Sequence, residues 1–473
     1  MKSHWHTFAV VVVLVIAVPL LLGSVAPGSQ EARSVDSLKA ALGQAGFEVN
    51  DGELASFDPT TLCCKPGSPI KCMYANVNAP YLCSTYVPPG PGEAQMQLLP
   101  NNFHLGQNEA LILVGQTPPP VAYFSYTVFL GTRRTTRFPL KNGDYTMMNA
   151  YVADSINNLT IHTSGPPKDP YNREILLFIV ADQQVKARVQ EAARRAGYPP
   201  SMFNTIVLPP AVLHLGVDQD ADTFWLTQRT AVPRDQQALD TYLAQKQTLL
   251  RVTLQDPAWQ PDPIPVPRVA VRGTGQTELD LMPAVDTLGE AIKAYYSSAQ
   301  VTEQPVDRMY WEGFTGLQEE INEMGPSGDA VGPRTAGQFF LPSGDFAIVY
   351  GVNHEATGKA TYASLALYED NLWIGLGSAY SKDFPGSVAR YLKDLPPDNP
   401  AVQNADKLYA WKVAWDCGGE ANCLPIENPG CANLNLTDSS PFKIQFRLYV
   451  EPATKTGPEI REVFFDRVLV FQP

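Results

Sequence analysis

Residues 174–208 constrain the fold of this chain more than any other stretch. The unbroken apolar run at 175–180, rich in β-branched and aromatic residues, is typical of a strand that is covered on both faces. Asp182 then stands at the N-cap position of a helix, whose apolar residues recur at helical spacing until Gly197 ends it. A second, mostly apolar run follows at 203–208. The stretch predicts strand, helix and strand, joined by a right-handed crossover if the strands are parallel.

The residues that follow repeat this pattern. A strand is expected at 223–232, a helix at 234–246 and a further strand at 248–254. The resulting order βαββαβ is that of a ferredoxin-like unit, which places four strands in one sheet and both helices on the same face. Because that fold carries many unrelated activities, it indicates no function by itself.

The C-terminal half is dominated by predicted strands. Six runs rich in β-branched and aromatic residues are separated by turn residues, at 346–352, 360–369, 371–377, 407–415, 443–451 and 461–471. A helix that begins near Met282 precedes them. The expected fold class is α+β, with a ferredoxin-like βαββαβ unit in the N-terminal half and a mainly antiparallel, β-rich C-terminal half.

Composition divides the chain into five expected segments. They are a signal peptide at 1–26, a helix with a cysteine- and proline-rich stapled segment at 27–95, an α+β domain with the ferredoxin-like unit at 96–255, a proline-rich linker at 256–276, and a helix with a β-rich domain at 277–473. The linker is the clearest boundary, because its prolines interrupt both helices and strands.

The N-terminus resembles an export signal. Lys2 precedes an apolar core at 8–22, and small residues lead to a cleavage position after Ala26. We therefore expect a secreted or extracytoplasmic protein. The alternative is an uncleaved N-terminal membrane anchor, because the apolar core is long for a signal and Pro27 follows the cleavage position. No other segment is apolar enough to cross a bilayer, so we expect no membrane span in the mature chain.

Seven cysteines fall into two clusters, Cys63, Cys64, Cys72 and Cys83 in the first and Cys417, Cys423 and Cys431 in the second. Export makes disulfide bonds the expected state of these cysteines. The paired spacing of zinc sites is missing from both clusters. We expect at least two bridges, with a bridge between the clusters left open as a possibility. Since seven is odd, at least one thiol is free or pairs with another chain.

Charge restricts the partners. The formal net charge of −13, with no compensating basic block, argues against a general nucleic-acid-binding protein. One basic cluster with aromatic neighbours, RRTTRFPLK, contains Arg133, Arg134, Arg137 and Lys141. The cluster is either a solvated hairpin end or a contact for an anionic ligand such as a sugar acid or a phosphate.

An acidic loop offers the best candidate for a metal site. Asp218, Asp220 and Asp222 have the spacing with which calcium loops begin, but Thr223 and Arg229 stand where a glycine and a glutamate are needed. A capped turn is therefore the favoured interpretation. The dinucleotide and phosphate-loop glycine patterns are also incomplete, so we expect neither a metal nor a cofactor.

His354 lies between two predicted strands in VNHEATGKATY, a loop that could hold a base or a ligand. Glu355, Lys359 and Tyr362 are its polar neighbours in sequence. Adjacent strand residues point to opposite faces, so a carboxylate partner for His354 would come from 218–222 or from the C-terminal strands. Catalysis would also require a cavity beside His354. We favour the other outcome, an exposed, convex position without a polar partner.

Two functions remain open, and a calcium-stabilised adhesion module ranks third behind them. The first is an exported, non-catalytic binding or cell-envelope-associated protein, whose partner is a small molecule, a glycan or an envelope component. The alternative is a secreted hydrolase with a site near His354 at the domain junction, although the GxSxG nucleophile motif is missing. A deep polar cleft that contains His354 would favour the enzyme, whereas a shallow aromatic face would favour binding.

Overall fold

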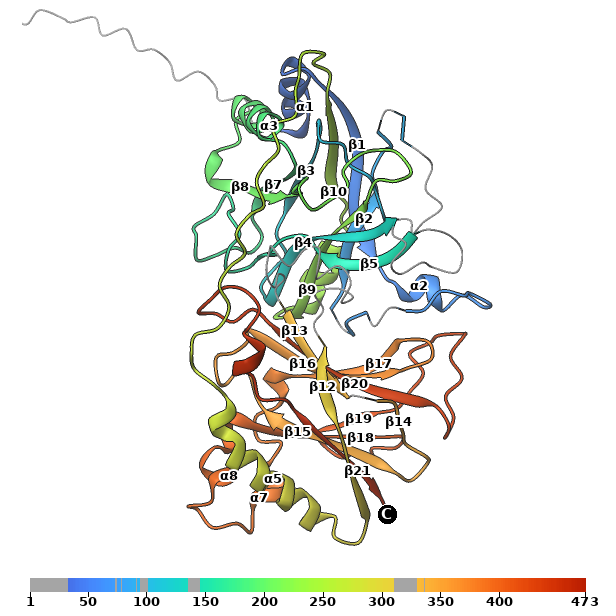
Figure 1. Cartoon of the computed structure of the whole chain (residues 1–473). Coiled ribbons are helices and arrows are strands. Elements are labelled where there is room, and N and C mark those ends of the chain that lie inside the picture. Colours follow the sequence, from blue (N-terminus) through green and yellow to red (C-terminus); the bar gives the residue numbers. More distant parts are fainter. Residues whose placement is uncertain are drawn as a thin grey trace, which may run out of the picture.

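The computed structural model describes residues 33–72, 75–77, 79–90, 92–93, 101–134, 145–309, 330–335 and 337–473. The expected signal peptide, together with Arg137 and Lys141 of the basic cluster, lies outside these residues. The described chain forms two halves, drawn one above the other in Figure 1. Over this part of the chain, no helix combines the length and the apolar character needed to cross a membrane.

One ten-stranded sheet organises the N-terminal half. Its strands are β1 (Phe47–Phe57), β2 (Tyr81–Tyr86), β3 (Glu109–Gln116), β4 (Val121–Arg134), β5 (Tyr145–Tyr151), β6 (Ile156–Asn157), β7 (Glu174–Val180), β8 (Phe203–Val207), β9 (Thr223–Pro233) and β10 (Gln247–Leu254). The order across the sheet is β5-β4-β9-β2-β1-β10-β3-β7-β8, and β6 pairs with β4.

Helices cover both faces of this sheet, as the apolar run at 175–180 predicts. The even-numbered side chains of the run pack against α1 (Val35–Gln44) and α3 (Gln183–Arg195). The odd-numbered side chains belong to a second core, which includes residues of α4 (Gln236–Leu243). Successive strand residues point to opposite faces, so a strand buried on both sides must be apolar throughout.

The strand–helix–strand prediction for 174–208 is confirmed. Asp182 caps α3 by accepting hydrogen bonds from the backbone N–H groups of Gln184 and Val185, and β7 and β8 are parallel neighbours. The ferredoxin-like arrangement is not confirmed, because it requires another strand between β7 and β8. In this sheet β9 lies between β4 and β2, whereas β10 lies between β1 and β3.

The physical reason lies in strands from earlier in the chain. β3 pairs with one edge of β10 and with β7, and so separates these two strands, while β1 pairs with the other edge of β10. As a further consequence, α3 and α4 lie on opposite faces of the sheet rather than on one. Element order along the sequence does not show this insertion, because the place of β3 between β7 and β10 depends on its pairing with strands far away in the chain, although β3 itself is strongly apolar.

Two antiparallel sheets form the body of the C-terminal half. One consists of β11 (Gln300–Gln304), β21 (Arg467–Gln472), β15 (Phe346–Val352), β18 (Leu408–Ala414) and β19 (Cys423–Pro425), in that order. The other consists of β12 (Val306–Met309), β13 (Ala330–Thr335), β20 (Pro441–Tyr449), β16 (Tyr362–Glu369) and β17 (Ile374–Tyr380), and β14 (Phe339–Phe340) pairs with β20. The parallel pair β18–β19 is an exception to the antiparallel pattern.

The two C-terminal sheets pack face to face. Apolar side chains of β15, β18 and β21 meet those of β16 and β20 in a shared core. The outer face of the five-stranded sheet is covered by α5 (Met282–Tyr295), α7 (Ala389–Leu392) and α8 (Pro400–Gln403). The other face of the six-stranded sheet is thereby left to meet the N-terminal half. The expectation of a β-rich C-terminal half is confirmed.

The segment between β10 and α5 connects the two halves along one side of the molecule (Figure 1). It first follows the N-terminal half, where the N–H of Ile264 donates to the carbonyl oxygen of Ala181. Farther along, the N–H groups of Thr274 and Gly275 donate to the carboxylate of Glu462 in the C-terminal half. The segment is therefore fixed to both halves.

One disulfide bond also joins the halves. Cys64 pairs with Cys431 across 367 residues of sequence, whereas the other two bridges, Cys63–Cys72 and Cys417–Cys423, are local. Cys83 is unpaired and buried, and burial raises the pKa of its thiol to about 12. This thiol therefore stays protonated and unreactive at neutral pH.

Candidate functional site

The basic cluster and the acidic loop, which the sequence presents as two separate candidate sites, contact each other. Arg133 donates from Nε and Nη2 to the two carboxylate oxygens of Asp222 over 2.9 and 2.6 Å, and both side chains are buried. Arg134 pairs with Asp220 near the surface, and Asp218 caps its own turn. Among the described residues of the two clusters, Arg133 and Arg134 have carboxylate partners, and Asp218 accepts from backbone N–H groups.

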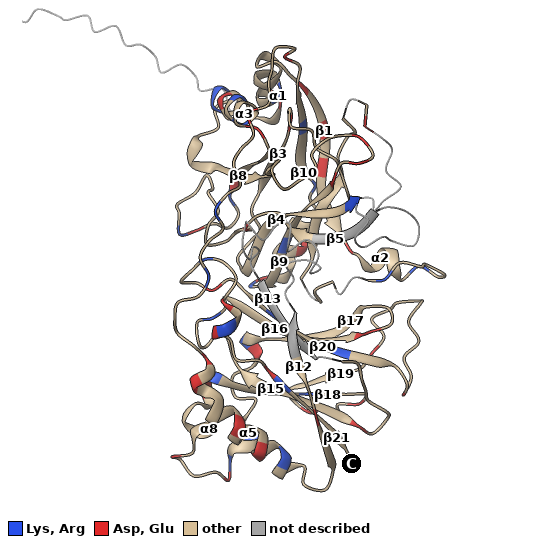
Figure 2. Cartoon of the chain, viewed as in Figure 1, with Lys and Arg blue, Asp and Glu red and all other residues tan. Residues whose placement is uncertain are grey.

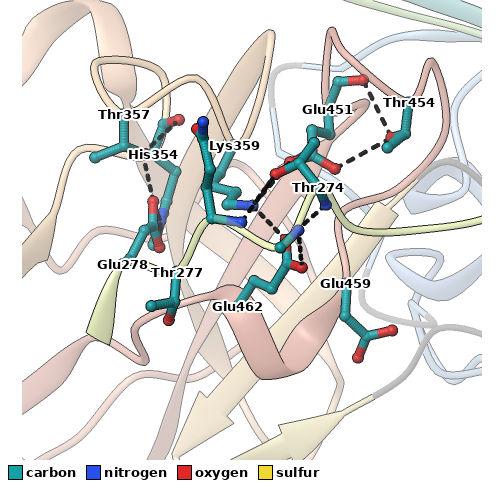
Figure 3. Close-up of polar contacts among 12 residues, drawn as sticks. Thr274, Thr277, Glu278, His354, Thr357, Lys359, Glu451, Thr454, Glu459 and Glu462 are labelled. Atoms are coloured by element: carbon teal, nitrogen blue, oxygen red, sulfur yellow. Dashed lines mark hydrogen bonds and ion pairs between the residues drawn. The ribbon is translucent and has the colours of Figure 1, made fainter. Parts of the chain in front are cut away.

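His354 is buried, and the expectation of an exposed, convex position is wrong. Its Nδ1 lies 2.8 Å from the nearer carboxylate oxygen of Glu278, and its Nε2 lies 3.5 Å from Asp466. Glu278 also accepts a hydrogen bond from the Thr357 hydroxyl (Figure 3) and, over 2.9 Å, one from the N–H of Phe464. One partner thus comes from the segment before β21, and the other from the end of the linker.

The protonation state of His354 follows from these carboxylates. Burial by itself lowers the pKa of the imidazole, but Glu278 and Asp466 outweigh it and raise that pKa to about 10. The ring is therefore an imidazolium at neutral pH and has no free site to accept a proton. Three cavities formed by described residues have volumes of about 410 to 460 Å³, and His354 lines none of the three.

Lys359 forms a second buried ionic contact beside His354. Its Nζ lies 2.8 Å from Glu451 and also contacts Glu462, the residue that accepts from the linker backbone (Figure 3). We name this set, Thr274, Glu278, His354, Lys359, Glu451 and Glu462, the linker clamp. Glu355, by contrast, is exposed and accepts a hydrogen bond from the Ser381 hydroxyl. The clamp secures the linker, because Glu462 contacts both Lys359 and the backbone N–H groups of Thr274 and Gly275.

Tyr362 belongs to a group of stacked rings where the two halves meet. Its ring lies 5.3 Å from that of Tyr449 at an angle of 17°, and Tyr449 lies 4.6 Å from Tyr123 of β4. Tyr380 extends the group, with its ring 5.7 Å from Tyr362. We name these four tyrosines, together with Tyr81 of β2, the tyrosine junction. This aromatic contact buries the face that the six-stranded sheet presents to the N-terminal half.

Arg229 of β9 extends into the tyrosine junction. Its Cζ lies 5.3 Å from the ring centre of Tyr81, which is its cross-strand partner, and 5.6 Å from that of Tyr449. Both distances suit cation–π contacts. In the sequence, Arg229 stands where a calcium loop would need a glutamate, and no other role for it is predicted there. A signal was present, because an arginine in the middle of the strand TFWLTQRTAV interrupts a mostly apolar pattern.

Arg447 of β20 contributes a second guanidinium to the same region. It is buried, donates to Gln445 over 3.0 Å, and lies 5.4 Å from the ring centre of Tyr368. Because Arg447 and Tyr449 are two residues apart on one strand, their side chains share a face. The tyrosine junction thus receives one arginine from each half of the protein.

A cavity of about 440 Å³ opens beside the tyrosine junction. Its walls include both ends of the Cys64–Cys431 bridge, and Asn76 and Tyr81 stand next to the junction. Asn76 donates from its backbone N–H to the Tyr81 hydroxyl over 2.9 Å, and from Nδ2 to the Tyr449 hydroxyl over 3.1 Å. One asparagine therefore connects the cavity to two of the stacked tyrosines.

Lys and Arg are interspersed with Asp and Glu over both halves (Figure 2). The cavity and the tyrosine junction combine aromatic rings with polar groups, a combination that suits a ligand.

Comparisons with known proteins do not assign a family. No protein-family model matches the chain, and no curated protein matches it. A solved structure of an uncharacterised protein from Burkholderia cenocepacia aligns with 93% of this chain and 88% of its own, at 12% sequence identity and a TM-score of 0.39. A likeness at this level supports neither a fold family nor a function.

Proposed function

We propose that the protein is an exported, non-catalytic binding protein whose ligand occupies the cavity between its two halves. The observation that carries the proposal is the cavity of about 440 Å³ walled by Asn76 and Tyr81. Ligand pockets in proteins have volumes of roughly 300–1,000 Å³ and combine aromatic walls with a few polar groups. The cavity fits this description, and its size suits a small molecule or a short piece of a glycan.

Export is supported by the predicted signal at 1–26 and by the three disulfide bonds, since such bonds persist mainly outside the cytoplasm. The hydrolase alternative has weaker support. Its candidate base, His354, is buried and protonated at neutral pH, so it cannot take a proton from water or from a substrate.

The test is ligand binding by the exported chain with its disulfides intact. Monosaccharides, sugar acids and envelope-type oligosaccharides are screened by their effect on the melting temperature, and hits are measured by calorimetry. The Asn76→Leu substitution removes the amide at the cavity wall and should weaken binding about tenfold or more, the equivalent of one lost hydrogen bond in a desolvated site.

The matched control is Asn50→Leu on β1, because Asn50 lies outside the cavity and hydrogen-bonds to Glu48. Binding by this control should equal that of the wild type. Hits that bind both variants with unchanged affinity would show that the cavity is not the site. Turnover of a hydrolase substrate by the wild type would contradict the non-catalytic assignment.

A further inference from the structure

We infer that the ligand of this cavity carries an anionic group, a carboxylate or a phosphate, that is recognised by Arg229 behind the cavity wall. The inference rests on the proposed binding function and adds the chemical class of the ligand. Three observations lead to it: the surroundings of Arg229, a second cation nearby, and a route from the cavity.

Arg229 has no counter-ion within the part of the chain that the structure describes. Its contacts are aromatic or hydroxylic, with the rings of Tyr81 and Tyr449 and a hydrogen bond to Tyr151, and its Nε atom has no hydrogen-bond partner. The Arg229 side chain is half-buried, and cation–π contacts compensate its charge less completely than a carboxylate would. The site is thus electrostatically incomplete without an anion.

Comparison with Arg133 makes the difference clear. Arg133 is buried, and its Nε and Nη2 both donate to the carboxylate of Asp222, whereas the half-buried Arg229 has no carboxylate partner among the described residues. In Arg229 the corresponding fork faces tyrosines. Guanidinium groups bind carboxylates and phosphates through two parallel hydrogen bonds, and this geometry remains available to Arg229.

A second cation, Arg447, adds to the positive electrostatic potential around Arg229. Arg447 has Tyr81 and Tyr449 among its electrostatic neighbours, and the same two rings flank Arg229. Two positive charges beside one pair of rings repel each other, and an anion between the halves reduces that repulsion. The effect is selective because the protein as a whole carries a net charge of −13, which disfavours anions elsewhere on its surface.

The cavity leads toward Arg229. Phe57, Tyr81 and Arg229 are paired across three neighbouring strands, so their side chains stand in one row on the same face. The first two line the cavity, and Arg229 is the next residue of the row. Asn76 stands at this boundary, is 6% exposed, and has no partner for its Oδ1. A displacement of Asn76 would give the anionic group access to Arg229.

Glucuronate, inorganic phosphate and uncharged glucose are the probes, measured by calorimetry on the disulfide-intact chain. We expect glucuronate or phosphate to bind at least about tenfold more tightly than glucose. Arg229→Gln should abolish this preference, whereas Arg229→Lys, which retains the charge without the fork, should retain part of it. The control Arg188→Gln removes an ion pair that Arg188 of α3 forms with Asp256, and this variant should bind like the wild type.

Stability of the unliganded protein gives a second, independent measurement. If the charge of Arg229 is compensated only by a bound anion, Arg229→Gln should leave the melting temperature of the unliganded protein unchanged or raise it. The substitution removes an uncompensated charge. A clear loss of stability, together with equal affinity for glucuronate and glucose, would show a purely structural arginine and overturn the inference. The proposed binding function would survive that result if Asn76→Leu still weakened the binding of glucose.

Discussion

At the scale of single residues, the interior cations of this protein differ in whether their charge is already compensated. His354 and Lys359 each contact two carboxylates within the linker clamp, whereas Arg229 is surrounded by tyrosines. A compensated buried charge serves the fold, and its removal leaves the partner carboxylates unpaired. An uncompensated one costs stability and suggests a binding role.

His354 should therefore make a pH-dependent contribution to stability. Its pKa in the folded protein is raised from 6.5 to about 10, so the contribution is complete below pH 6.5 and is lost as the pH rises through about 10. His354→Gln should lower stability by about 3–5 kcal/mol at pH 6, and the deficit should shrink toward pH 10. Calorimetric melting temperatures of both proteins across this range give the measurement.

The control for this experiment is His162→Gln, because His162 is exposed. Its melting temperature should follow that of the wild type at every pH. A deficit in His354→Gln that is the same at pH 6 and pH 10 would mean that the His354 charge does not contribute.

At the scale of helices and strands, strong apolar patterns predicted the structure and weak ones did not. The doubly buried strand β7, the cap at Asp182 and most of the C-terminal strands are visible in the sequence, because burial on a sheet demands apolar residues. β1 was missed. Only Phe47 and Leu54 of this strand are buried, so its eleven residues lack a marked alternation.

The candidate sites follow the same logic. Ionisable clusters are visible in the sequence as Arg133–Arg134, as 218–222 and as the loop at His354, but their pairing depends on contacts between distant segments. The cavity at Asn76 could not be predicted, since its walls come from segments separated by more than three hundred residues. Local sequence patterns indicate which residues are buried. The position of a binding site, in contrast, depends on which helices and strands contact each other in the fold.

The linker clamp provides a test at this scale. Lys359→Met leaves Glu451 and Glu462 without their cation and should destabilise the C-terminal half by about 3–5 kcal/mol. Because Glu462 also holds the backbone at Thr274 and Gly275, limited proteolysis should cut the linker at 256–276 faster than in the wild type.

The comparison variant is Lys246→Met, which removes an exposed ion pair with Glu53 and should cost no more than about 1 kcal/mol. Equal cleavage of the linker in both variants and the wild type would show that the clamp does not hold the segment.

At the scale of the whole molecule, the Cys64–Cys431 bridge joins the two halves by a disulfide bond. The loop that it closes contains most of the chain, because the two cysteines are 367 residues apart in sequence. In the chain-entropy description, closing a loop of this length stabilises the folded state by roughly 5 kcal/mol or more, whereas a loop the size of that between Cys417 and Cys423 gives roughly 2 kcal/mol.

Two paired substitutions compare these bridges. Replacing Cys64 and Cys431 by serine should lower the melting temperature more than replacing Cys417 and Cys423, with both variants measured under non-reducing conditions. Loss of the long bridge should also weaken ligand binding, because both of its cysteines line the cavity. Equal decreases in melting temperature for the two variants would contradict the chain-entropy account.

The same bridge has a consequence for the order of events during biogenesis. Under the proposed export, which begins at the N-terminus, Cys64 would reach the oxidising side long before Cys431, which follows 367 residues later. During that interval Cys63, Cys72 and Cys83 are the nearest available partners, and Cys63 adjoins Cys64 in the chain. Correct oxidation therefore requires that Cys64 remain reduced, or be corrected by a disulfide isomerase, until the final tenth of the chain has arrived.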